Sequence, residues 1–251
     1  MRSTPILLLV CLSTVVARGA PPQQDTRWGT LIGRFVYDGP RPDPPPLVVP
    51  AGRLGKMPNP VDETLLVDAQ GGLCNVLLFV RTKNVPVHPR RLRDLPPRVV
   101  LESKGLRFEP HILALTTAQT LVIRNSDPFA INANVTEIGG PGMNPLLAPA
   151  HEATYKFRQV HGLPQPVTSN IQPWYKAYIL PCGNPYFAIS QTDGTFALHG
   201  LPLGEFEFQA WHEVPGFINT PDWPKGRFRR RIEPGENDLG TIKLSPKVFK
   251  R

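Results

Sequence analysis

Residues 190–213 have the sequence SQTDGTFALHGLPLGEFEFQAWHE, and this stretch decides the fold class. Within it, apolar and polar side chains alternate over 205–210 (EFEFQA), which is the period-two pattern of a strand with one apolar face. Asp193 and Gly194 suit a tight turn, and the PLG at 202–204 suits a following hairpin. The stretch therefore predicts strands joined by short turns.

The rest of the chain extends the same pattern. Period-two alternation recurs over 30–37 and 121–124, and short unbroken apolar runs at 76–80 and 112–115 predict fully buried strands. No window of helical length keeps apolar residues at i, i+3 and i+4 without Pro or Gly. We expect an all-β protein built as one or two sandwiches.

The N-terminus indicates export. Residues 5–17 (PILLLVCLSTVVA) follow Arg2 and form an apolar run too short to cross a bilayer as a helix, but of the length of a signal-peptide core. We expect residues 1–20 to be a cleaved signal peptide, the alternative being a short uncleaved anchor. Since no later stretch approaches about 18 apolar residues, we expect no transmembrane segment after cleavage.

Composition excludes two classes of protein. The 31 Pro and 21 Gly make up about a fifth of the 251 residues, below the share of about 25–30% that is typical of disordered chains. Of the net charge of +8, +2 lies in residues 1–20 and +6 in residues 225–251, so the rest is neutral. A nucleic-acid binder would carry its basic residues over a whole face, so we expect no nucleic-acid partner.

The basic run at 227–231 (RFRRR) allows two interpretations. On an edge strand, its alternating arginines would protect the edge against pairing with other chains. Alternatively, they would contact an anionic polysaccharide, a lipid head group or an acidic protein.

Two cysteines remain after removal of the signal. Cys74 lies in an apolar, strand-like run, and Cys182 is distant in the sequence. An export compartment permits a disulfide between them, and two small buried thiols are the alternative.

Enzyme and metal signatures do not occur in the sequence. There is no nucleophile elbow, phosphate-binding loop, dinucleotide fingerprint or His-Glu-x-x-His. The six histidines include no pair at metal-ligand spacing. We therefore expect no catalytic residue, no metal ligand and no cofactor.

Both ends of the mature chain carry a recognisable pattern. It consists of GTLIGRFVYDGP (29–40), GGLCNVLLFVRT (71–82), the stretch 190–213 quoted above and RRIEPGENDLGTIKL (230–244). This pattern resembles a carboxypeptidase regulatory-like β-sandwich of the transthyretin type, also called a carbohydrate-binding-like fold. The resemblance implies one discontinuous sandwich over 27–85 and 186–246, interrupted by about a hundred residues.

The intervening residues carry a second pattern. FEPHILALTTAQTLVIRNSDPFAINANV (108–135) and VTSNIQPWYKAYILPCGNPYFAIS (167–190) are similar to secreted bacterial cupredoxin-like proteins of the methylamine utilization type. The resemblance implies a cupredoxin-like sandwich over 98–182, inserted in the first one. In such relatives, a strand-end His and a Cys-x-x-His-x-x-Met loop hold copper.

The four copper-ligand positions of that family are all different here. Ile131 stands at the upstream His position, Ser169 at the Cys, Gln172 at the loop His and Tyr175 at the Met. Ile has no lone pair, and a neutral hydroxyl cannot replace a soft thiolate. We expect neither type-1 copper nor electron transfer at this locus.

Two interpretations of the altered locus remain open. In one, the site is refilled: Ile131 adds apolar volume, Tyr175 fills space with its hydroxyl near solvent, and Ser169 and Gln172 satisfy loop backbone groups. In the other, polar and aromatic side chains form a small ligand pocket. The candidate pocket residues are Ile131, Asn132, Ser169, Gln172, Trp174 and Tyr175.

Together these patterns predict a non-catalytic binding or structural protein of the periplasm, cell surface or extracellular space, whose partner is a cell-envelope polysaccharide or a protein. The first alternative is a carbohydrate-binding module of the cell envelope. The second is a copper protein for electron transfer that uses non-standard ligands. An enzyme would have to depend on Gln172 or Tyr175.

Overall fold

The computed structural model describes residues 27–47, 49 and 60–250. Their regular structure is mainly β-strand, with the six-residue helix α1 (Pro89–Asp94) and two short 3-10 turns (Pro224–Gly226 and Pro246–Phe249), so the all-β prediction is confirmed. No helix in this part of the chain has the length and apolar character needed to cross a bilayer. The expected signal peptide, 1–20, lies outside the described residues.

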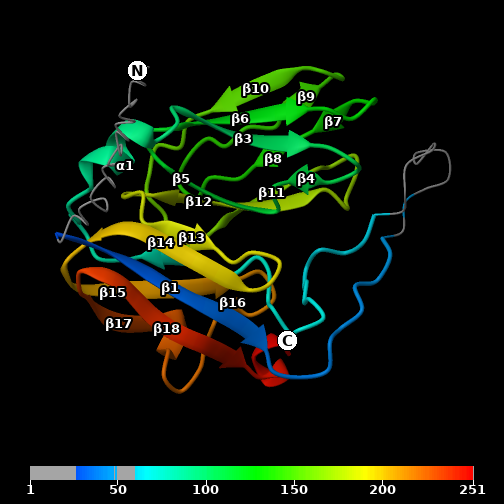
Figure 1. Cartoon of the computed structure of the whole chain (residues 1–251). Coiled ribbons are helices and arrows are strands. Elements are labelled where there is room, and N and C mark those ends of the chain that lie inside the picture. Colours follow the sequence, from blue (N-terminus) through cyan, green and yellow to red (C-terminus); the bar gives the residue numbers. More distant parts are fainter. Residues whose placement is uncertain (1–26, 48, 50–59, 251) are drawn as a thin grey trace, which may run out of the picture.

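Two sheets are formed by strands near the two ends of the chain (Figure 1). The outer sheet has the order β14-β1-β18, and the second sheet has the order β13-β2-β15-β16, with β17 also paired to β15. Their strands are β1 (Trp28–Tyr37), β2 (Leu77–Val80), β13 (Phe187–Ile189), β14 (Thr195–Pro202), β15 (Gly204–His212), β16 (Gly216–Phe217), β17 (Arg227–Ile232) and β18 (Gly235–Leu244).

Two further sheets and a small ribbon are formed by the residues in between. The third sheet has the order β5-β12-β11-β8, the fourth has the order β10-β6-β3-β4, and β7 pairs with β9. Their strands are β3 (Arg98–Ser103), β4 (Phe108–Glu109), β5 (Ile112–Thr116), β6 (Thr120–Asn125), β7 (Ile131–Asn132), β8 (Asn134–Val135), β9 (Leu146–Leu147), β10 (Glu152–Tyr155), β11 (Gln165–Thr168) and β12 (Lys176–Cys182).

The four sheets are stacked as layers with an apolar cluster between each neighbouring pair. The sequence of strand β2 is an unbroken apolar run because both faces of the strand are buried. Leu78 and Val80 point into the core shared with the outer sheet, and Leu77 and Phe79 point toward the third sheet. Strand β5 is likewise buried on both sides. The predicted buried strands at 76–80 and 112–115 are therefore confirmed.

The turn at Asp193 and Gly194 forms as predicted. The Asp193 carboxylate accepts from the Thr195 amide at 2.9 Å, and Gly194 has φ +83°, in the left-handed region. A Cβ on Gly194 would overlap the carbonyl oxygen of Phe35. Glycine is required there by both conformation and space.

The predicted hairpin at 202–204 is wrong. Strand β14 pairs with β1 in the outer sheet, whereas β15 pairs with β2 and β17 in the second sheet. Leu198 on β14 and Phe206 and Phe208 on β15 all lie in the same apolar cluster. The chain crosses between layers because both strands bury their apolar faces in that shared core.

Both remaining thiols are free. Cys182 is buried in the cluster between the second and third sheets, and Cys74 is half-buried near the carbonyl oxygen of Ser190, at 3.8 Å from Sγ. Of the two alternatives that the sequence allowed, the structure shows separate thiols rather than a disulfide.

Candidate functional site

The six candidate pocket residues come from two places in the chain that lie next to each other. Ile131 and Asn132 form β7, and the other four belong to the loop 169–175 between β11 and β12. The loop is joined to the segment before β7 by a 3.1 Å hydrogen bond from Nε2 of Gln172 to the carbonyl oxygen of Ala130. It is closed on itself by the Tyr175 amide, which donates to the Gln172 carbonyl at 2.9 Å.

The Asn132 carboxamide connects β7 to this loop. Its Oδ1 accepts from the hydroxyl of Ser169 at 2.8 Å and from the amides of Asn170 and Ile171 at 3.0 and 3.2 Å. Its Nδ2 donates to the side-chain oxygens of Asn144 and Asn170, at 2.6 and 2.8 Å. Every donor and acceptor of this buried amide is therefore used inside the protein.

Ser169 and Gln172 complete each other's hydrogen bonding. The Ser169 hydroxyl accepts from the Gln172 amide at 3.1 Å and lies 3.2 Å from its Oε1. Gln172 is fully buried and Ser169 nearly so. Both side chains satisfy backbone and side-chain groups of the loop, as the refilled-site interpretation predicts.

Tyr175 points into the core rather than toward solvent. Its hydroxyl donates at 2.7 Å to Oδ2 of Asp127, and its ring meets the Phe108 ring edge to face, with centroids 5.2 Å apart. Burial, together with the hydrogen bond to Asp127 and the negative charge of that carboxylate, holds the pKa of Tyr175 well above its usual value. The expectation that its hydroxyl lies near solvent is wrong, because Asp127 provides a buried acceptor.

Ile131 and Trp174 differ in exposure. Ile131 is fully buried in the apolar cluster between the third and fourth sheets, which also contains Tyr175. Trp174 is half-buried against that cluster, and its Nε1 has no hydrogen-bond partner among the described residues. The structure thus brings all six residues to one end of the third and fourth sheets.

The side chains at this locus do not fit a copper ion. Ile131 offers no donor atom, and the Tyr175 hydroxyl donates to Asp127. The Ser169 hydroxyl lies within hydrogen-bond distance of Oδ1 of Asn132 and of Oε1 of Gln172. A type-1 site needs a thiolate and two imidazoles in trigonal geometry. The donor set here contains neither.

Within residues 27–47, 49 and 60–250, no three His, Cys, Asp or Glu side chains are grouped so that they could hold a metal ion. His111 bonds through Nε2 to the Glu213 carboxylate at 2.6 Å, at the junction of the second and third sheets. His212 is buried beside it, and burial lowers its pKa to about 4.

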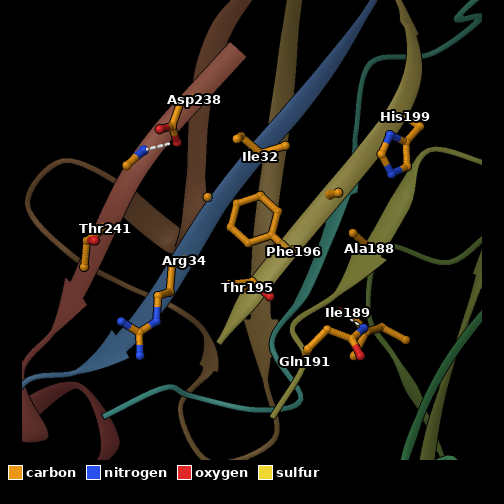
Figure 2. Close-up of a pocket in the computed structure, with 13 residues that line it drawn as sticks. Ile32, Arg34, Ala188, Ile189, Gln191, Thr195, Phe196, His199, Asp238 and Thr241 are labelled. Atoms are coloured by element: carbon orange, nitrogen blue, oxygen red, sulfur yellow. Dashed lines mark hydrogen bonds between the residues drawn. The ribbon is translucent and has the colours of Figure 1, made fainter. Parts of the chain in front are cut away.

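A hollow of about 700 Å³ lies on the outer sheet, away from the six candidate residues (Figure 2). Its lining includes Ile32 and Arg34 from β1, His199 from β14 and Thr241 from β18. The polar groups are occupied locally: Nε of Arg34 donates to the Asp193 carbonyl at 2.8 Å, and Nδ1 of His199 lies 3.4 Å from the Thr30 hydroxyl. None of the six candidate residues lines this hollow.

A second hollow was not anticipated from the sequence. It has a volume of about 490 Å³ and lies where three loops meet, around residues 81–85, 160–162 and 182–184. Arg81, Lys83 and His161 contribute its basic groups. These residues are up to 80 positions apart in the sequence and share no motif. Only the folded structure brings the three loops together.

Comparisons with known proteins give matches to solved structures only. No protein-family model and no curated protein matches the chain. A copper-containing nitrite reductase from Thermus scotoductus SA-01 is similar at 22% identity and TM-score 0.31, over 34% of this chain and 22% of that one. An oxidized amicyanin variant is similar at 8% identity and TM-score 0.31, over 41% of this chain and 97% of that one. A purple cupredoxin from Nitrosopumilus maritimus is similar at 14% identity and TM-score 0.29, over 34% and 99%.

Proposed function

We propose that this chain is an exported, non-catalytic binding or structural protein that contains a copper-free cupredoxin-like sandwich. The observation that carries the proposal is the locus formed by β7 and the loop 169–175. There, the residues at all four copper-ligand positions are buried, and the three polar ones are hydrogen-bonded to partners within the protein. Such a site is a packed end of a domain rather than a vacant metal cage.

The pairing around the intervening residues supports the insertion part of the proposal. Strand β2 ends at Val80 and β13 begins at Phe187, and the two strands pair with each other, Phe187 facing Phe79. Strands separated by about a hundred residues thus meet as neighbours in the second sheet. This arrangement is expected if residues 98–182 form a unit set between them.

The export part of the proposal is based on residues 1–20 alone. Mass spectrometry of the protein recovered from a bacterial host tests it. We expect a mature N-terminus near residue 21 and a protein outside the cytoplasm. An intact Met1 in a cytoplasmic product would contradict the assignment.

A reconstruction experiment tests the cupredoxin-like part. The triple variant Ile131→His, Ser169→Cys, Gln172→His restores two imidazoles and a thiolate, and it keeps Tyr175, whose bond to Asp127 is needed in the core. We expect this variant to bind one copper(II) ion per chain, with an intense visible absorption band from the thiolate.

The matched control is the double variant Ile131→His, Gln172→His, which lacks the thiolate and should show no such band. Circular dichroism establishes that each variant is folded. A folded triple variant that binds no copper, or binds it without the band, would show that positions 131, 169 and 172 do not correspond to the ligand positions of a cupredoxin.

A further inference from the structure

The hollow between the two sandwiches combines a suitable size with unsatisfied polar groups. Its volume of about 490 Å³ lies in the range of small-molecule sites. Its walls come from the end of β2 with the loop after it, the loop between β10 and β11, and the loop between β12 and β13. The lining residues are Phe79, Val80, Arg81, Thr82, Lys83, Asn84, Val85, Val160, His161, Gly162, Cys182, Gly183 and Asn184.

Three basic side chains face this hollow, and none of its described lining residues is acidic. The Lys83 ammonium is exposed and has no partner among the described residues. The His161 side chain is only 12% exposed, and its Nε2 has no hydrogen-bond partner among them. A buried polar atom without a partner is costly unless a ligand or water satisfies it.

Arg81 is held in place by the second sheet. Its Nε lies 3.2 Å from the Glu207 carboxylate, and its Nη1 donates to Oε1 of Gln209 at 2.6 Å. A Cβ on Gly162 would lie 3.4 Å from Nη1, so the loop that carries His161 passes close to the guanidinium. The positive group is therefore fixed before any ligand arrives.

Two acids lie next to the basic groups but do not line the hollow. Glu207 pairs with Arg81, and the buried Glu137 lies 4.0 Å from Nε2 of His161. Burial acts to raise the pKa of Glu137, but hydrogen bonds from Tyr155 and from the amides of Arg158 and Gln159 outweigh it and hold the pKa below its usual value. Of the three basic groups of the hollow, Lys83 is the one with no acidic partner among the described residues.

The other lining groups suit a hydroxylated ring. The Thr82 hydroxyl accepts from the Glu207 amide at 2.9 Å, which leaves its proton to donate, and the Asn84 amide has no partner among the described residues. Val85 and Val160 add apolar wall, and Val160 is 57% exposed. Hydroxyl recognition, an apolar face and one excess positive charge match a sugar that bears a carboxylate.

The arginines of β17 extend the positive surface away from the hollow. In the register of β15 and β17, Arg229 lies opposite Glu207, the partner of Arg81, and Arg227 lies opposite Gln209. The Arg229 side chain forms an exposed ion pair with Glu205 at 3.5 Å. Alternating side chains of a strand lie on the same face, so Arg81, Arg227 and Arg229 share one face of the second sheet. This surface would accommodate further acidic units of a polymer.

We infer that this hollow, which we name the inter-sandwich site, binds the carboxylate-bearing ring of an acidic saccharide. The inference rests on the proposed binding function and specifies its ligand class. Lys83 binds the carboxylate, Arg81 contributes a fixed positive charge, and His161, Thr82 and Asn84 bind hydroxyl groups. The ring lies against Val160.

Calorimetric titration of the mature chain with D-galacturonate, trigalacturonate and D-galactose tests this inference. We expect galacturonate to bind, trigalacturonate to bind more tightly through the arginines of β17, and galactose to bind at least tenfold more weakly. Raising the salt concentration from about 50 mM to about 500 mM should weaken binding of both acids. Equal binding of galactose, or no binding of either acid, would overturn the inference.

Two pairs of variants locate the site. Lys83→Gln should weaken galacturonate binding about three- to tenfold, and Val160→Asp, which puts a carboxylate into the hollow, at least tenfold. The matched controls are Lys104→Gln and Leu146→Asp, which change exposed residues of the same types elsewhere and should leave affinity within twofold. Equal losses in variant and control would place the binding elsewhere.

Competition with inorganic sulfate separates recognition of a sugar from recognition of a bare anion. We expect sulfate to displace galacturonate only at much higher concentration, and equal competition would overturn the saccharide assignment. Failure of all these ligands would leave the copper tests unaffected. A chain that binds copper would instead overturn the proposed function, whatever the titrations show.

Discussion

The hydroxyl of Tyr175 lies 2.7 Å from Oδ2 of Asp127, and both residues are buried. The other oxygen of Asp127 accepts from the amide of Gly105 at 2.8 Å, so this carboxylate joins the loop before β12 to the turn between β3 and β4. The Tyr175 side chain thus connects parts of the chain that are 48 to 70 residues apart and fills the apolar cluster between the third and fourth sheets.

The Tyr175 contact predicts a loss of stability when the hydroxyl is removed. Tyr175→Phe leaves the buried Asp127 carboxylate with fewer donors, which should cost about 1–3 kcal/mol in the free energy of unfolding. Urea denaturation measures it. Tyr37→Phe is the control, because the Tyr37 hydroxyl has no partner among the described residues, and it should cost less than about 0.5 kcal/mol. Equal costs would mean that the Asp127 bond adds nothing.

Glu213 joins the second and third sheets by charge. Its side chain is 2% exposed, its Oε1 accepts from His111 at 2.6 Å, and its Oε2 forms an ion pair with Nζ of Lys176 at 2.9 Å. Glu213→Gln should therefore lower the free energy of unfolding by about 2–3 kcal/mol, the range for hydrogen bonds to charged groups. Glu205→Gln, which breaks an exposed ion pair with Arg229, should change it by no more than about 1 kcal/mol. If the Glu213→Gln variant were as stable as the wild-type protein, this network would not stabilise the junction.

His212 predicts a loss of stability in acid. Burial lowers its folded-state pKa to about 4, below the ordinary value of 6.5, so the unfolded chain takes up the proton first as the pH falls. Its contribution is complete above pH 6.5 and should shrink by about 2–3 kcal/mol toward pH 4.5. His212→Asn should remove this part of the pH profile in chemical denaturation, whereas replacing the exposed His151 should not. An unchanged profile in the His212 variant would contradict the assignment.

Two glycines with positive φ distinguish the cost of a left-handed backbone from the cost of steric overlap. Gly194 (φ +83°) is crowded by Phe35 and Leu73, whereas Gly240 (φ +65°) has no atom within 4 Å of an added Cβ. Gly240→Ala should cost only the left-handed conformation, about 1–2 kcal/mol, and Gly194→Ala should cost more than about 3 kcal/mol. Thermal unfolding of both variants checks the difference. Similar costs would show that the turn relaxes around the new methyl group.

The strands could be predicted from local patterns, but their partners could not. The alternation of 205–210 and the apolar run of 76–80 specify strand and burial through the spacing of side chains alone. Pairing is non-local, so the sequence suggested a hairpin at 202–204 where the chain crosses between sheets. Tertiary packing in the shared core decided that connection.

The candidate site shows the same limit. The sequence already shows that residues 131, 169, 172 and 175 offer neither a thiolate nor an imidazole, because a donor atom is present or absent in the residue itself. The role of Asn132 as a hub and the buried acceptor for Tyr175 depend on contacts 37 to 48 residues away along the chain. The inter-sandwich site depends on three loops and left no signal in the sequence.

The proposed function requires that the locus around β7 and the loop 169–175 hold no copper. Metal analysis and visible absorption of the mature wild-type chain, exposed to copper(II) and then dialysed against a weak chelator, test it most directly. We expect well under one copper per chain and no thiolate charge-transfer band. One tightly held copper per chain, lost in the variant Ser169→Ala or Gln172→Ala, would contradict it.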